Sequence, residues 1–197
     1  GAGMIGRRLA ERLSINHKVR VFDSFERSSA DFRSLSKVFD CVEGDVRDED
    51  CLIRSLDGFD VVFHLAAYGS VVESVVNPRE NFESNVLGTL SVLEAVRTSG
   101  VSKVVFSSTG GALMGNTPPP VDESCVPAPI SPYGASKLCC EGYLNAYSEA
   151  YGIDALVFRF GNVYGPYSAH KKGAITNFIK AAMLGKDITI YGDGNAT

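Results

Sequence analysis

The first six residues, Gly1-Ala2-Gly3-Met4-Ile5-Gly6, place their glycines at the spacing G-x-G-x-x-G. Ile5, Leu9 and Leu13 continue from this hexad at helical spacing, which predicts a helix that begins inside it. Glycines at such a turn let the backbone approach a pyrophosphate, whose negative charge is stabilised by amides at the helix N-terminus. Glycine is common, however, so the hexad alone leaves a dinucleotide site and an ordinary turn equally open.

The next segment, residues 18–23 (KVRVFD), alternates polar and apolar residues and predicts a strand that ends in an acid. Asp23 follows the glycines by about 20 residues, the usual separation in dinucleotide-binding units. A carboxylate there accepts hydrogen bonds from the ribose hydroxyls of adenosine and repels a 2′-phosphate, which favours NAD over NADP. A solvated aspartate at a strand end is the alternative, and Arg27 lies close enough to affect the choice of cofactor.

Further segments have the apolar character of buried strands, with helical patterns between them. These strands are predicted at residues 38–42, 60–67, 103–108 and 155–160. Such alternation predicts an α/β fold, a doubly wound parallel sheet covered by helices on both faces. In the usual strand order a first strand lies between residues 18–23 and 60–67, and the sequence contains no such strand. We therefore expect two facing rows of unpaired backbone groups at this place.

A helix is predicted to begin at Asn77-Pro78, because proline is favoured in the first turn. Asn85 lies beside the expected buried stripe of this helix, and a buried amide must be hydrogen-bonded. Asn85 is therefore either a packing anchor or a support for an active site. His64, on the preceding strand, is interpreted as structural. The expected buried stripe consists of Phe82, Val86, Leu90, Leu93 and Val96.

A second motif, Tyr133-Gly134-Ala135-Ser136-Lys137, follows a helix-start signal at Ser131-Pro132. Tyr133 and Lys137 are four residues apart, so their side chains share one face of the helix. A positive charge beside a phenol favours the phenolate, which would lower the pKa of Tyr133 and make it a candidate general base. An exposed helix pair is the alternative. The hydroxyls that end the preceding strand and are placed to meet a substrate are Ser107, Ser108 and Thr109.

The last part of the chain changes character near Pro166. A turn leads from the strand at residues 155–160 to a predicted helix at 174–184 and a predicted strand at 187–191. We interpret residues 1–166 as a dinucleotide-binding domain that lacks its first strand. Residues 167–197 would then be the beginning of a second, truncated domain.

Composition narrows the class of protein. Of the 197 residues 45% are hydrophobic and 21% charged, and the net charge is −4, which is typical of a globular chain. The basic residues are scattered, so neither a nucleic acid nor an anionic membrane surface is predicted as a partner. The five cysteines lack C-x-x-C spacing, which favours reduced thiols in the cytoplasm. The three histidines are far apart, and no metal site is predicted.

Taken in order, eight segments resemble the extended short-chain dehydrogenase/reductase superfamily, specifically the NAD-dependent epimerases and dehydratases of nucleotide sugars. The resemblance covers nearly the whole chain and is strongest to the UDP-glucose 4-epimerase group. It implies a Rossmann domain that binds NAD, followed by a small domain for the nucleotide sugar. The segments are GAGMIG, VFD, GDVRD, HLAA, NVLGT, FSST, YGASK and FGNVYGP.

The resemblance also implies roles for individual residues. Thr109, Tyr133 and Lys137 would be catalytic, and Thr109, Tyr133 and Asn162 would contact the substrate. Asp45 would accept a hydrogen bond from the adenine amino group, although a turn aspartate is the alternative. The full set of expected NAD contacts is Gly1, Gly3, Met4, Ile5, Gly6, Asp23, Asp45, Val46, Leu65, Ala66, Ala67, Asn85, Ser107, Tyr133 and Lys137.

Departures from the family pattern bear on the reaction. The related 4,6-dehydratases carry an Asp-Glu pair after the threonine, whereas Thr109 is followed by Gly110-Gly111. A threonine without an acid favours epimerisation at C4 of a UDP-hexose, through a transient 4-keto sugar. Another nucleotide-sugar activity (dehydratase, decarboxylase or reductase) and a non-catalytic dinucleotide-binding protein are the alternatives. Met114 stands where many relatives have tyrosine, and a homodimer is expected.

Overall fold

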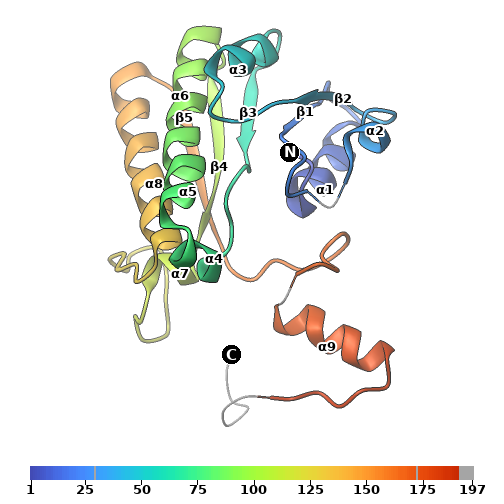
Figure 1. The fold of residues 1–197 in the computed structure, drawn as a ribbon. Helices are drawn as coiled ribbons and strands as arrows, with labels where there is room; N and C mark the ends of the chain where they lie inside the picture. The colour runs from blue at the N-terminus through green and yellow to red at the C-terminus, as the bar shows by residue number, and fades with distance from the viewer. Residues whose placement is uncertain (29, 172, 191–197) are drawn as a thin grey trace. The chain divides into compact units, whose positions relative to one another are not determined.

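The computed structural model describes residues 1–28, 30–171 and 173–190. The chain divides into two compact units, Gly1–Gly161 and Asn162–Thr197 (Figure 1). The first unit contains all the strands found in the described ranges, and the second contains helix α9 (Ala174–Met183). Each unit is described by itself below.

The strands of the first unit form two parallel sheets, as expected for a Rossmann-type α/β fold. One sheet pairs β1 with β2, and the other has the order β3-β4-β5. The register aligns Thr109 at the end of β4 with Phe160 at the end of β5. The strand bounds are β1 Arg20–Asp23, β2 Asp40–Glu43, β3 Val61–His64, β4 Lys103–Thr109 and β5 Asp154–Phe160.

Helices connect the strands in the alternation that the sequence predicted. Along the chain, α1 packs on β1 and α2 on β2, while α6 and α8 pack beside β3, β4 and β5 (Figure 1). The bounds in the first unit are α1 Met4–Leu13, α2 Phe32–Leu35, α3 Glu49–Leu56, α4 Val71–Val76, α5 Pro78–Phe82, the π-helical turn η1 Glu83–Leu87, α6 Gly88–Ser99, α7 Gly111–Met114 and α8 Pro132–Tyr151. Among the residues that the structure describes, no helix is long and apolar enough to cross a membrane.

Helix α8 begins as the sequence predicted. The Ser131 hydroxyl accepts a hydrogen bond from the backbone N–H of Gly134 at 3.1 Å, and Pro132 occupies the first turn. A Cβ at Gly134 would lie 2.1 Å from the carbonyl oxygen of Ala112, so only glycine lets the first turn of α8 approach the segment after β4 this closely. The helix ends at Gly152, whose φ of 71° closes it in the left-handed conformation.

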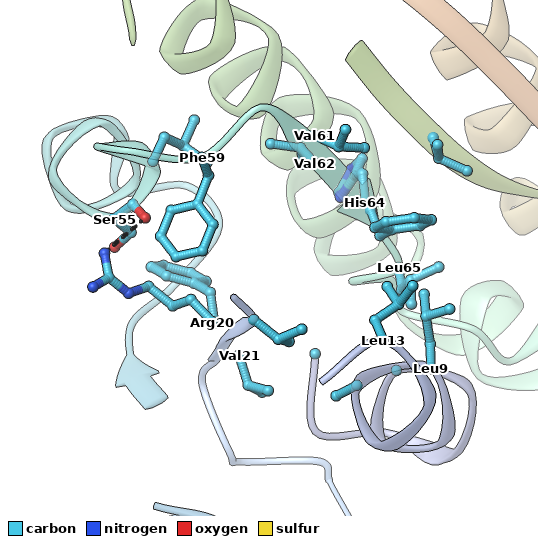
Figure 2. A pocket seen from close by; sticks show the side chains of 18 of the residues that line it. Leu9, Leu13, Arg20, Val21, Ser55, Phe59, Val61, Val62, His64 and Leu65 are labelled. Carbon is cyan, nitrogen blue, oxygen red and sulfur yellow. Dashed lines mark hydrogen bonds between the residues drawn. The ribbon is translucent and has the colours of Figure 1, made fainter. Parts of the chain in front are cut away.

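The two sheets of the first unit are separated by a cavity of about 520 Å³. Leu9 and Leu13 of α1 line it together with Val21 of β1 and Val62 of β3 (Figure 2). In the described part of the chain no backbone pairing joins β1 to β3. The sheet is thus interrupted at the position where the sequence analysis expected unpaired strands.

The two faces of the larger sheet differ in burial. On the face that packs against α6 and α8, Val104 and Phe106 are fully buried. On the opposite face Phe63, Leu156 and Phe158 are 39%, 45% and 46% exposed. Val105, which is aligned with Phe63 and Leu156 on this face, is 7% exposed. The predicted doubly wound α/β fold is thus confirmed, with parallel strands and helices in alternation.

Two expectations were wrong. Phe82 is 51% exposed and does not belong to the buried stripe, because the π turn η1 adds a residue to the helical turn and shifts the residues that face the core. The expected strand at residues 187–191 is absent from its described part, residues 187–190, which have no partner strand. Tyr191 lies outside the described residues.

Candidate active site

The glycines of the first turn fulfil two structural requirements. A Cβ at Gly1 would lie 2.7 Å from the carbonyl oxygen of Phe22, and one at Gly6 would lie 2.1 Å from the carbonyl oxygen of Gly1. At Gly3, by contrast, a Cβ would have no atom within 4 Å. Two glycines thus permit close backbone packing, and the third faces open space at the N-terminus of α1. This arrangement fits a dinucleotide pyrophosphate.

Asp23 ends β1 beside the glycine turn. Its Oδ2 accepts hydrogen bonds from the amino group of Gly1 and the N–H of Ala2, both at 2.8 Å, and its Oδ1 accepts from the N–H of Phe25 at 2.8 Å. Asp23 is therefore a fixed carboxylate at the edge of the turn, as an adenosine ribose requires.

Asp45 and Val46 follow β2. The Asp45 carboxylate accepts hydrogen bonds from the backbone N–H and the Nε of Arg47, at 2.8 and 2.9 Å, and the side-chain bond from Arg47 lowers the pKa of Asp45. A contact from Asp45 to adenine, which stays a prediction, would have to compete with Arg47. Val46 contacts the backbone at Gly88, where a Cβ would lie 2.4 Å from a Val46 methyl group.

Tyr133 and Lys137 lie in the first two turns of α8. Lys137 is 2% exposed, and its Nζ donates a hydrogen bond to the carbonyl oxygen of Ser107 at 2.8 Å and lies 4.5 Å from the centre of the Phe106 ring. Burial lowers the pKa of Lys137 to about 8. The expected lowering of the Tyr133 pKa is not found, because in this arrangement burial raises it. Lys137 thus links the motif of α8 to the end of β4.

Asn85, which lies in η1, supports the start of α8, where Tyr133 and Lys137 lie. Its Oδ1 accepts a hydrogen bond from the N–H of Tyr68 at 2.7 Å, and its Nδ2 donates to the Ser136 hydroxyl at 2.9 Å. Ser136 in turn donates to the carbonyl oxygen of Tyr133 at 2.8 Å. Asn85 is 2% exposed and joins the segment after β3 to the start of α8. It is a packing anchor in the structure, and a direct contact with NAD stays a prediction.

Two of the three hydroxyls at the end of β4 donate hydrogen bonds to different partners. Ser108 is 4% exposed and donates a hydrogen bond to Glu141 of α8. The prediction that its hydroxyl meets a substrate is therefore wrong. The Ser107 hydroxyl donates to the carbonyl oxygen of His64 at 3.4 Å. Arg159 of β5 binds Glu141 through Nη2 at 2.8 Å. These partly buried contacts fix the end of β4, where Thr109 lies, against α8.

The remaining residues that the sequence singled out lie in several different places in the chain. Leu65, Ala66 and Ala67 follow β3, and Leu65 and Ala66 line the cavity between the sheets. Asn162 belongs to the second unit, so its contact with a substrate stays a prediction. Met114 is 4% exposed and lies in the core. His64 is structural as expected, because burial lowers its pKa to about 3 and its Nε2 lies 2.9 Å from the Thr89 hydroxyl.

Several residues that support the site were not predicted from the sequence. Asn81 and Thr89 are buried four residues to either side of Asn85, and Asn81 donates to the carbonyl oxygen of Tyr68 at 3.1 Å. A repeat of polar residues every four positions was the signal that could have revealed them. Glu141 follows Lys137 by one helical turn, so its position on the same face could have been predicted, whereas its partners could not.

Known proteins resemble the chain throughout its length. The family profile of the NAD dependent epimerase/dehydratase family matches residues 1–197. The UDP-glucose 4-epimerase of Mycolicibacterium smegmatis is 39% identical over 206 residues, which cover 100% of this chain and 65% of that protein. The chain therefore spans about two thirds of the length of this relative.

Solved structures confirm the fold. The crystal structure of UDP-glucose 4-epimerase from Thermotoga maritima with UDP-glucose has a TM-score of 0.89 and 36% identity, and the match covers 98% of this chain and 64% of that one. A dTDP-glucose 4,6-dehydratase of Streptomyces venezuelae with NAD bound has a TM-score of 0.82 and 33% identity, over 98% and 63% of the two chains. The chain therefore belongs to the NAD-dependent epimerase/dehydratase family.

Proposed function

We propose that this chain is the NAD-binding part of a nucleotide-sugar 4-epimerase that acts on a UDP-hexose. The observation that carries the proposal is the arrangement of Tyr133 and Lys137 on α8 beside the end of β4, where Thr109 is followed by two glycines. A dehydratase needs an acid at that position to move protons during the loss of water, and a 4-epimerase does not.

The residues present fit NAD as the cofactor. Gly3 leaves open space at the N-terminus of α1 for the pyrophosphate, and Asp23 presents a carboxylate for the adenosine ribose. NAD, when bound, supplies a hydride acceptor and donor and a positive charge beside the site. Lys137, held by Ser107, would bind the nicotinamide ribose.

In the proposed reaction Tyr133 takes the proton from the C4 hydroxyl and later returns it to the same oxygen. Thr109 donates a hydrogen bond to that oxygen and orients it. Lys137 has a pKa of about 8, so it is mostly protonated at neutral pH and favours the phenolate of Tyr133. This attraction opposes the burial of Tyr133, which favours the neutral phenol.

The test is to incubate the full-length protein separately with UDP-glucose, UDP-galactose and a UDP-uronic acid, and to identify each product by chromatography and mass spectrometry. Epimerisation gives the C4 epimer of unchanged mass. A product that has lost water would identify a dehydratase, and loss of carbon dioxide from a UDP-uronic acid would identify a decarboxylase. Either result, without interconversion of the hexoses, would reject the proposed reaction.

We also propose a cytoplasmic homodimer. The five cysteines are free thiols, which agrees with a reducing compartment. Leu87 of η1 and Tyr143 and Tyr151 of α8 are 41%, 41% and 54% exposed, and large side chains of this kind are enriched at interfaces between subunits. Sedimentation of the full-length protein tests this, and a monomer at micromolar concentration would reject the homodimer.

A further inference from the structure

Arg27 is the first basic residue after Asp23 in the sequence. The intervening loop folds back on Asp23, because the N–H of Phe25 donates to the Asp23 carboxylate at 2.8 Å. Consecutive Cα atoms are about 3.8 Å apart, so the Cα of Arg27 lies within about 8 Å of that of Phe25. An arginine at this distance from the ribose carboxylate is the residue type that could accommodate the 2′-phosphate of NADP.

The guanidinium of Arg27 is nevertheless engaged elsewhere. Its Nη1 lies 3.2 Å from Oε2 of Glu73 in α4, and its Nη2 lies 3.1 Å from Oε1 of Glu80 in α5. The Cζ atom lies 4.0 Å from the centre of the Tyr68 ring. Two carboxylates and one aromatic ring therefore fix both the direction and the plane of the guanidinium.

Tyr68 is itself a rigid support for this contact. Its side chain is buried, and its backbone N–H and carbonyl groups are held by Asn85 and Asn81. The position of Arg27 is thus set by the same buried amides that support the start of α8. Movement of Arg27 towards the ribose would break two ion pairs and the contact with the ring.

The charges of this cluster also oppose a 2′-phosphate. Glu73 and Glu80 carry one more charge than Arg27 neutralises, and Asp23 adds another negative group on the side of the ribose. A phosphate monoester carries between one and two negative charges at neutral pH. The 2′-phosphate of NADP would therefore approach carboxylates, while the guanidinium of Arg27 is already paired with two of them.

We propose that Glu73 and Glu80 strengthen the preference for NAD over NADP that Asp23 favours, because they hold Arg27 in ion pairs and withhold it from the 2′-phosphate. The inference rests on the NAD site of the proposed function and assigns a specificity role to two residues outside that site. Loss of both glutamate charges releases Arg27 and creates an NADP site.

The experiment measures the binding of NADH and NADPH to the full-length protein by calorimetry, without any sugar substrate. In the double variant Glu73→Gln with Glu80→Gln, we expect the Kd for NADPH to fall about tenfold and the Kd for NADH to change less than about twofold. Tenfold is the usual scale of one hydrogen-bonded charge pair in a partly exposed site. Both glutamates are more than half exposed, so the substitutions should leave the fold intact, and retained NADH binding verifies this.

Two controls isolate the role of Arg27. Glu83→Gln removes a neighbouring carboxylate that pairs with Arg79 and Arg47, and it should leave NADPH binding unchanged. Adding Arg27→Ala to the double variant should abolish the gain. An unchanged Kd for NADPH in the double variant, an equal gain in Glu83→Gln, or a gain that survives Arg27→Ala would each reject the inference. Absence of NADH binding to the unaltered protein would instead reject the NAD site of the proposed function, and this inference with it.

Discussion

The two halves of the proposed site are held in place by different means. Around α8, polar side chains are fixed by buried partners that are far apart in the sequence, such as Asn85 with Ser136 at a separation of 51 residues and Lys137 with Ser107 at 30. Around α1, the nucleotide half depends on glycines, whose missing side chains permit close backbone contact at Gly1 and Gly6.

The difference predicts how each half responds to change. A side chain held by buried partners contributes to stability as well as to chemistry, so its substitution affects both. A glycine that faces open space contributes only to the binding of a ligand. The half around α1, called the nucleotide half, also borders the cavity between the two sheets. The half around α8, called the chemical half, packs against the main hydrophobic cluster.

The largest effect is expected at the cavity. Residues 1–197 expressed alone should show no cooperative unfolding and no NAD binding, because β1 and β3 face each other across apolar space without backbone pairing. Several unmade hydrogen bonds at about 1 kcal/mol each and unfilled apolar contacts at about 2 kcal/mol each equal the whole stability of a typical domain, about 5–15 kcal/mol. Urea denaturation followed by circular dichroism, with the full-length protein as control, measures this. A sharp unfolding transition together with NAD binding in residues 1–197 would show that the fold is stable without a strand between β1 and β3.

The next effect concerns the chemical half. Tyr133→Phe in the full-length protein should lower turnover by roughly 10²-fold or more, the usual scale for a general acid or base, and should retain NAD binding. Tyr143→Phe is the matched control, since Tyr143 lies on the same helix and is 41% exposed. Turnover assays and calorimetry on both variants check the prediction. Near-normal turnover of Tyr133→Phe would remove this phenol from the reaction.

The two halves also differ in how far the sequence predicted them. The glycine turn, the Ser131 cap and the Tyr133–Lys137 spacing were predicted because each signal lies within a few residues. The partners of Glu141 could not be predicted, because Ser108 and Arg159 reach it only through the folding of separate strands.

The predictions that were wrong concern properties that depend on the surrounding structure rather than on a local sequence pattern. Phe82 is exposed because a π turn follows it, and no local sequence pattern predicts this turn. The expected strand at residues 187–191 needed a neighbour for pairing, and its described part has none. The pKa of Tyr133 depends on how deeply α8 is buried, which the spacing to Lys137 does not give.

A smaller effect distinguishes two glycines of the same turn. Gly6→Ala should lower the stability of the protein by about 1–3 kcal/mol and weaken NAD binding, because the new methyl group would lie 2.1 Å from the carbonyl oxygen of Gly1. Gly3→Ala should leave stability within about 0.5 kcal/mol and still weaken NAD binding, because its methyl group enters only the open space. Thermal unfolding and NAD titration of each variant test the contrast. Equal losses of stability would mean that Gly3 also serves packing.

The smallest effect lies in the buried histidine that connects β3 to α6. The pKa of His64 is lowered from about 6.5 to about 3 by burial, so the unfolded chain binds a proton between these pH values and the folded chain does not. His64 therefore makes the protein lose stability as the pH falls from 6.5 towards 3. His64→Gln keeps a polar partner for Thr89 and cannot titrate, so its stability should fall less between pH 7 and pH 5, by about 1–2 kcal/mol. Denaturant unfolding of both full-length proteins at the two pH values measures the difference, in which the titration of the carboxylates cancels. Parallel losses would mean that His64 becomes protonated within the fold, and that the core beside the chemical half is less closed than its 4% exposure indicates.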